Sequence, residues 1–212
     1  MVGGLIGSRI FYLAEHGGLT HPGQWLGSYG FTFYGGFIAV ALGLAGYIWR
    51  TRASIVYLDL VALALPLGYA IGRVGDIIYG EHYGPASTFL LAVRNSNPGA
   101  NVPNHALVYH NGGLYESLIG LAVFAIAWPL RERLLRRPAS AVWLVLALLS
   151  AGRFVEFFVR SDSATVALGL ETAQWTSLVL IAVAAVGALV TWRHGSRGAA
   201  RVRRRSIFAA RR

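Results

Sequence analysis

The sequence predicts an all-α fold, a polytopic membrane bundle of about six transmembrane helices. Two observations come from composition: 55% of the 212 residues are hydrophobic and only 13% are charged. A soluble globular domain carries about twice that share of charged residues. The third observation is a series of apolar stretches of about 18–20 residues, the length that crosses a bilayer. The chain therefore has the composition of an integral membrane protein rather than that of a soluble enzyme.

The expected spans follow one another along the chain as apolar stretches separated by polar residues and glycines. They cover residues 1–13, 30–49, 55–78, 113–130, 141–159 and 173–192. The first is short, and the third and fifth hold charged residues near one end. Residues 1–192 thus form one predicted transmembrane domain, and residues 193–212 form an arginine-rich tail.

The arginines predict the orientation of these spans. They are concentrated after the second, fourth and sixth spans, in segments 50–52, 131–137 and 193–212. Cytoplasmic loops of membrane proteins are enriched in basic residues, so both chain ends are expected in the cytoplasm. The loops after the first, third and fifth spans would then face outward.

A glycine-rich stretch at the end of the third span is the densest group of polar residues. It reads Gly72-Arg73-Val74-Gly75-Asp76 and continues to Glu81 and Gly84. A charge at membrane depth is costly, so it usually faces a partner or a ligand. Glycines beside the charges leave room for a head group because they carry no side chain. The stretch therefore predicts a binding site.

Polar residues from other spans are expected at the same depth as this stretch. They are Arg9, Tyr34, Glu116, Arg153 and Glu156. Arg153, for example, lies ~18 Å into its span from the inner side at the helical rise of ~1.5 Å per residue. Charges of both signs at one depth favour a single site in the outer half of the bilayer. The alternative is a set of structural ion pairs or of side chains that reach water at span ends.

The same residues belong to short motifs that occur in a fixed order along the chain. These motifs are Gly7-Ser8-Arg9, Tyr34-Gly35-Gly36, Asp59, Gly72-Arg73-Val74-Gly75-Asp76, His110-Asn111-Gly112-Gly113-Leu114-Tyr115-Glu116, Gly152-Arg153-Phe154-Val155-Glu156 and Gln174-Trp175-Thr176-Ser177. The ordered set resembles the prolipoprotein diacylglyceryl transferase family, bacterial membrane enzymes that lipidate lipoprotein precursors. The resemblance covers residues 4 to about 190.

The resemblance implies a reaction and a location. Members of the family move the diacylglyceryl group of phosphatidylglycerol to the lipobox cysteine of a prolipoprotein and release glycerol phosphate. The expected partners are therefore phosphatidylglycerol and prolipoprotein signal peptides, at the outer leaflet of the bacterial inner membrane. No cofactor, metal or nucleic acid is expected: the chain has no cysteine, and the spacing of its histidines matches no metal site.

The resemblance also implies roles for individual residues. The implied catalytic residues are Arg73, Arg153, Glu81, His110 and Tyr34. The implied substrate-binding residues are Arg9, Gly35, Gly36, Asp76, Gly84, Tyr115, Glu116 and Glu156. In this scheme the arginines hold phosphate or glycerol, because a guanidinium donates paired hydrogen bonds to such groups.

Several positions depart from the family pattern. Tyr34 stands where the family has histidine, Asp76 where it has asparagine and Leu149 where it has tyrosine, and Glu156 lies one residue closer to Arg153. The family's first span has no counterpart, so the sequence predicts either a start upstream of Met1 or a shortened relative. A catalytically impaired relative that binds phosphatidylglycerol or lipoprotein signal segments is thus the alternative. A small-solute transporter is the third hypothesis, although the inner half of the bundle is almost purely apolar.

Overall fold

The computed structural model describes residues 2–15, 18–21, 23, 25, 33–52, 54–80, 82–100, 102–160 and 165–209. These residues form seven α-helices, one short 3-10 helix and four short strands, so the chain is mostly helical, as predicted. Its contacts divide it into two compact units, residues 1–55 and residues 56–212, which are described separately.

The first unit is a pair of packed helices. Helix α1 spans Val2–Glu15, helix α2 spans Phe33–Thr51, and the 3-10 helix η1 covers Gly18–Thr20. A Cβ added at Gly7 would lie 2.2 Å from the Cβ of Ala39. Small residues at such a contact let the backbones of two helices approach closely.

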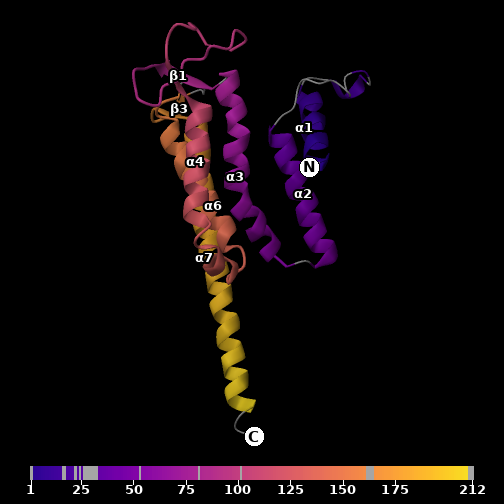
Figure 1. Cartoon of the computed structure of the whole chain (residues 1–212). Coiled ribbons are helices and arrows are strands. Elements are labelled where there is room, and N and C mark those ends of the chain that lie inside the picture. The colour runs from indigo at the N-terminus through magenta and orange to yellow at the C-terminus, as the bar shows by residue number, and fades with distance from the viewer. Residues whose placement is uncertain are drawn as a thin grey trace. The chain divides into compact units, whose positions relative to one another are not determined.

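The second unit is a bundle of four long helices and one short one (Figure 1). They are α3 (Val56–Tyr79), α4 (Gly112–Ala127), α5 (Arg131–Leu135), α6 (Ser140–Glu156) and α7 (Thr172–Ala209). Helix α6 packs against α3, α4 and α7, and α3 packs against α4. The apolar core of this bundle consists of Leu63, Val123, Ala127, Ala141 and Val145.

Six of the helices lie over the six predicted spans, with ends that differ by a few residues at most positions. The exception is α7, which continues without a break to Ala209. The predicted tail therefore begins inside a helix. Alanine and arginine are both good helix formers, which accounts for the continuation.

Two small antiparallel sheets were not part of the predicted fold. Strand β1 (Tyr83–Ala86) pairs with β2 (Tyr109–Asn111), and β3 (Thr165–Ala167) pairs with β4 (Leu170–Glu171). Figure 1 shows both sheets at the end of the bundle where α4 begins. Because β2 leads directly into α4, the first sheet sets where that helix starts.

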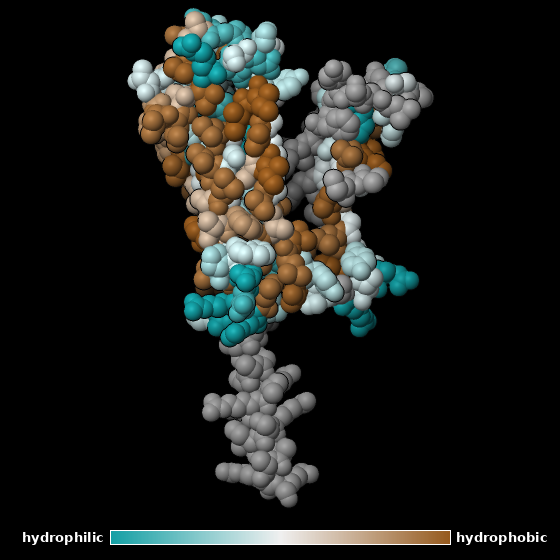
Figure 2. Space-filling view, viewed as in Figure 1, coloured by the Kyte–Doolittle hydropathy of each residue, from teal (hydrophilic) through white to brown (hydrophobic). Residues whose placement is uncertain are grey.

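The surface of the second unit is that of a helical membrane protein. Helices α3 and α7 contain stretches long and apolar enough to cross a bilayer, Val56–Tyr79 and Thr172–Arg193. Ile71, Val155 and Val186 are 65%, 66% and 60% exposed. In Figure 2 hydrophobic residues cover the middle of this unit, and hydrophilic residues gather at its ends. A soluble surface seldom presents so large an apolar patch, whereas lipid requires one.

Asp59 joins α3 to the start of α6. Its carboxylate is fully buried and accepts hydrogen bonds from the backbone N–H groups of Ala139 at 2.7 Å, Ala141 at 2.8 Å and Val142 at 3.2 Å. Ala139 is the N-cap residue of α6 and has no polar side chain to fill that role. Asp59 therefore caps α6 from another helix, and its charge also faces the positive end of the α6 dipole.

The substitution Asp59→Asn is expected to destabilise the bundle by roughly 1–3 kcal/mol, since an amide nitrogen cannot accept the bonds that one carboxylate oxygen accepts. Thermal unfolding of the purified protein in detergent measures the effect. The control is Glu132→Gln, which removes an exposed carboxylate from α5. Equal melting temperatures for the two variants would contradict the capping role.

Candidate functional site

A single buried carboxylate, that of Glu116, is the centre of the site. Glu116 lies in the second turn of α4 and its side chain is 1% exposed. Arg153 of α6 donates from Nη1 to its Oε1 at 2.6 Å, and Arg160 donates to the same oxygen at 3.0 Å. Arg73 of α3 forms an ion pair with Oε2, an oxygen that accepts no aligned hydrogen bond from the described residues. Three guanidinium groups thus converge on one carboxylate.

Further polar groups surround these arginines. Asp76 pairs with Arg73, three residues earlier on α3. Glu156 accepts a hydrogen bond from Arg160 at 3.0 Å. The hydroxyl of Tyr69 accepts one from Arg153 at 3.2 Å, and its ring lies 5.1 Å from the guanidinium carbon of Arg73. We call these seven residues the Glu116 cluster: Tyr69, Arg73, Asp76, Glu116, Arg153, Glu156 and Arg160.

The members of the cluster differ in exposure. The side chain of Arg160 is only 4% exposed, whereas those of Arg153 and Arg73 are 36% and 23% exposed. A buried charge needs close partners, and Arg160 contacts two carboxylates among the described residues. Each guanidinium has five N–H donors, so Arg73 and Arg153 retain donors that the carboxylates do not use. These two arginines can contact a ligand, while Arg160 holds Glu116 and Glu156 in place.

The start of α4 is inserted between α3 and α6. Asn111 caps it by accepting a hydrogen bond from the N–H of Leu114 at 2.8 Å. A Cβ at Gly113 would lie 2.8 Å from the Cβ of Asp76, and one at Gly112 would lie 3.2 Å from Oε1 of Glu156. The two glycines are therefore required for close packing. They bring the positive N-terminal end of α4 next to two carboxylates, which stabilises both negative charges.

His110 lies in β2, two residues before the start of α4. Its Nδ1 is 2.5 Å from the hydroxyl of Tyr115, and the ring of Phe89 lies 5.9 Å away between centroids. In the described part of the chain, no polar group contacts its other ring nitrogen, Nε2. The imidazole is thus bonded at one nitrogen and open at the other. In the tautomer in which Nδ1 donates its hydrogen to the Tyr115 hydroxyl, Nε2 is the nitrogen that can accept a proton.

Gly84 has a packing reason of its own. It is buried in β1, and an added Cβ would lie 2.0 Å from the carbonyl oxygen of Val159. The strand therefore approaches the segment after α6 more closely than any other residue would allow. The predicted contact between Gly84 and substrate stays a prediction.

Four of the predicted site residues lie in the first unit. Arg9 of α1 is 8% exposed, and its guanidinium carbon lies 5.6 Å from the ring of Tyr12. Gly35 is buried in α2, and a Cβ on Gly36 would lie 2.4 Å from Oγ of Ser8. The side chain of Tyr34 lies outside the described residues. Glu81, which belongs to the second unit, also lies outside them. A shared site between these residues and the Glu116 cluster stays a prediction.

The structure therefore brings together five of the predicted residues: Arg73, Asp76, Glu116, Arg153 and Glu156. The predicted site omitted Tyr69 and Arg160. A signal for Tyr69 was present, because it lies four residues before Arg73 on α3, whereas Arg160 lies beyond the end of α6 at Glu156 and helical spacing could not place it. Residues spaced as Tyr69 and Arg73 are meet on one face of a helix.

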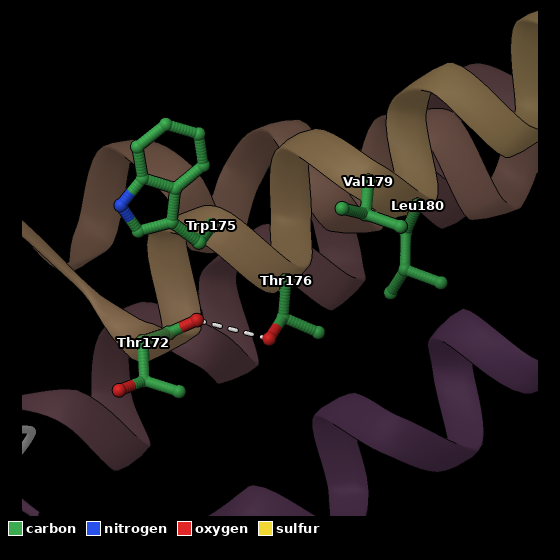
Figure 3. A pocket seen from close by; sticks show the side chains of 5 residues that line it. All are labelled: Thr172, Trp175, Thr176, Val179 and Leu180. Carbon is green, nitrogen blue, oxygen red and sulfur yellow. Dashed lines mark hydrogen bonds between the residues drawn. The ribbon is translucent and has the colours of Figure 1, made fainter. Parts of the chain in front are cut away.

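Two hollows occur elsewhere on the second unit, and neither is lined by a member of the cluster. Figure 3 shows the smaller one, 320 Å³, on the first turns of α7 between Thr172 and Leu180. The hydroxyl of Thr176 there donates to the carbonyl of Thr172 at 2.9 Å, so it is already used. Among the described residues, no group of three or more His, Asp or Glu side chains is arranged to hold a metal ion.

The fold and the cluster define a class: a helical membrane protein that presents partly exposed arginines from a buried ionic cluster. The family model of prolipoprotein diacylglyceryl transferase matches residues 1–190, and the chain belongs to that family. A relative from Methylobacillus flagellatus is 31% identical over 85% of this chain and 69% of its own length. One from Cupriavidus metallidurans is 31% identical over 96% and 75%. Both are named phosphatidylglycerol–prolipoprotein diacylglyceryl transferase.

Proposed function

We propose that this protein transfers the diacylglyceryl group of phosphatidylglycerol to the cysteine thiol of prolipoproteins. The observation that carries the proposal is the pairing of Arg73 and Arg153 through Glu116, with both guanidiniums partly exposed next to an apolar surface. The names and coverage of the relatives support the same substrates. Glycerol phosphate is the second product.

In the proposed reaction the phosphate group of the lipid binds to Arg73 and Arg153. Their unused N–H donors match the oxygens of a phosphate, and a guanidinium fork binds two oxygens at once. The C–O bond between the diacylglyceryl carbon and the phosphate breaks, and negative charge grows on the departing phosphate. Fixed positive groups in a poorly solvated site stabilise that charge more strongly than water-exposed groups would.

The thiol of the prolipoprotein forms the new C–S bond and must lose its proton. We assign that proton to Nε2 of His110, the open ring nitrogen, with Tyr115 holding the other side of the ring. Glu116 and Arg160 act as positioning residues, because they hold the two phosphate-binding arginines in place without meeting the substrate.

We further propose that all six long helices cross the inner membrane, with both ends in the cytoplasm and the Glu116 cluster in the outer leaflet. The excess of arginine in alternate loops supports this orientation. A reporter enzyme that is active only in the cytoplasm is expected to be active when it is fused after Arg212, and a reporter that is active only in the periplasm is expected to be inactive there. Activity of a periplasmic reporter at that position would reverse the topology.

The proposed reaction can be tested with the full chain in liposomes that contain phosphatidylglycerol labelled in its acyl chains. A synthetic lipobox peptide is expected to become labelled, and the same peptide with serine in place of cysteine is not. Labelling of neither peptide, together with retained binding of phosphatidylglycerol, would favour the second candidate, a catalytically impaired lipid-binding relative.

One contact favours that second candidate. Asp76 pairs with Arg73, so a carboxylate already occupies N–H donors of an arginine that is proposed to bind the phosphate. With Asp76 included, the three guanidiniums of the cluster face three carboxylates, and their charges cancel if all are ionised. An anionic ligand must therefore compete with Asp76.

The substitution Asp76→Asn is expected to tighten binding of phosphatidylglycerol by about tenfold, since it removes one charged competitor worth ~1.5 kcal/mol. Lipid titration of the purified protein gives the dissociation constant. Asp76→Glu keeps the charge and serves as the matched control. An Asp76→Asn protein that binds no better than wild type would show that Asp76 does not compete with phosphate. If the double variant Tyr34→His with Asp76→Asn gains transfer activity, the wild-type protein is the impaired relative.

A further inference from the structure

The larger hollow is a groove between α6 and α7. Its volume is 870 Å³, within the range of small-molecule sites in proteins. Trp143, Leu144 and Ala147 line it from α6, and a longer stretch between Ile181 and Trp192 lines it from α7. The lining is mostly apolar along its length, as expected for a groove that holds a hydrocarbon chain.

The groove is lined by the indole of Trp143 on α6 and by small side chains on α7. The ring of Trp143 packs against the backbone of α7, where a Cβ added at Gly187 would lie 2.6 Å from the ring. Alanines rather than larger residues occupy positions 184, 185 and 188 on α7. The space therefore results from small side chains beside the indole, and larger residues at those positions would fill it.

The polar lining is at one end of the groove. Arg136 and Arg137, both exposed, contribute to the lining together with Pro138 and Ser140. The hydroxyl of Ser140 donates to the carbonyl of Leu134, so it is already used. No acidic residue is among the described residues that line the groove. The end therefore offers two guanidinium groups to an anion.

The groove is separate from the Glu116 cluster. Ser140 and Glu156 mark the two ends of α6 and lie sixteen residues apart, ~24 Å along the helix axis. A ligand at Arg136 and Arg137 is thus near the opposite end of α6 from a ligand at Arg153. The groove needs a function other than holding the lipid that reacts.

We propose that the groove binds an anionic phospholipid of the membrane, with an acyl chain along α6 and α7 and its phosphate on Arg136 and Arg137. Charge complementarity decides between possible occupants. An apolar helix of a second protein would leave both arginines unused, whereas an anionic head group pairs with both and its chain fills the apolar part. The bound lipid holds the ends of α6 and α7 together and takes no part in the transfer.

Native mass spectrometry of the full chain in detergent tests the proposal, with phosphatidic acid as the anionic probe and phosphatidylcholine as its zwitterionic counterpart. The wild type is expected to retain phosphatidic acid in preference to phosphatidylcholine. R136Q/R137Q removes the head-group contacts, and A184L/A188L fills the groove. Each double variant is expected to lose one retained phosphatidic acid molecule, its occupancy falling by about tenfold or more. R136Q/R137Q loses the charged hydrogen bonds to the phosphate, and A184L/A188L leaves no room for the acyl chain.

R133Q is the matched control, since Arg133 is exposed on α5 and does not line the groove. It is expected to retain as much phosphatidic acid as the wild type. Equal retention by R136Q/R137Q and the wild type would overturn the proposal, and so would equal binding of the two lipids by the wild type. A dimer that only A184L/A188L dissociates would identify a second copy of the chain as the occupant instead, which also overturns it.

Discussion

Replacing Arg153 with alanine is expected to lower kcat/KM for diacylglyceryl transfer by ~100-fold or more, the usual result of removing one fixed donor to a developing negative charge. Arg153 is the most exposed arginine of the Glu116 cluster, and only one of its nitrogens is committed to Glu116 and Tyr69. The same result is expected for Arg73→Ala, since Arg73 approaches Glu116 from the other side. Transfer to a lipobox peptide in phosphatidylglycerol liposomes gives both constants.

The conservative and control variants decide how this result is interpreted. Arg153→Lys keeps the charge but loses the planar fork, so it is expected to recover only part of the activity. Arg94→Ala removes an exposed arginine from the loop between β1 and β2 and is expected to behave as wild type. A decrease in kcat alone would mean that Arg153 stabilises the transition state. An increase in KM alone would mean that Arg153 binds the lipid equally well before and during the reaction. Full activity of both alanine variants would reject the phosphate site.

Replacing Glu116 with glutamine is expected to destabilise the protein by ~3–5 kcal/mol, the cost of breaking a buried ion pair on one side only. Glutamine has nearly the same shape, so packing is kept while the charge is lost. Arg160 is expected to be affected most, because its side chain is only 4% exposed and it loses one of the two carboxylates that it contacts among the described residues, keeping Glu156. Thermal unfolding in detergent measures the change.

A double-mutant cycle separates the lost charge from a general packing defect. Removing Arg160 as well, in Glu116→Gln with Arg160→Gln, takes away one of the three guanidinium groups that lose their contact with Glu116 in the first substitution. The double variant is therefore expected to be more stable than the sum of the two single effects. Strict additivity would mean that the two side chains do not interact in the folded protein. The transfer activity should stay low in either case, because Arg73 and Arg153 have lost their common anchor.

The helices could be predicted because each is encoded by its own residues. Hydrophobic length is a property of a continuous segment, and long apolar segments in lipid form helices. The sheets escaped prediction for the converse reason: β1 and β2 are four and three residues long, too short for an alternating pattern, and they depend on each other for their hydrogen bonds. The predicted span 173–192 agrees with the apolar part of α7, Thr172–Arg193, and the helix continues past it to Ala209.

For the site, the sequence could identify residues but not their partners. Arg73 and Asp76 are neighbours on one helix, and their pairing follows from spacing alone. The link between Glu116 and Arg153 joins residues 37 positions apart, and the cap that Asp59 provides for α6 spans at least 80. Such distances are set by how helices pack, which local spacing does not determine.

The sequence by itself thus determined the membrane class, the approximate helix ranges and the chemical types gathered near one end of the bundle, because hydrophobicity and charge are properties of each segment. Only the tertiary structure decided that Glu116 is the common anchor of Arg73, Arg153 and Arg160, and that Arg160 is buried while Arg153 remains accessible. The physical reason is that a buried charge takes as its partner whichever opposite charge the packing of distant helices brings within reach.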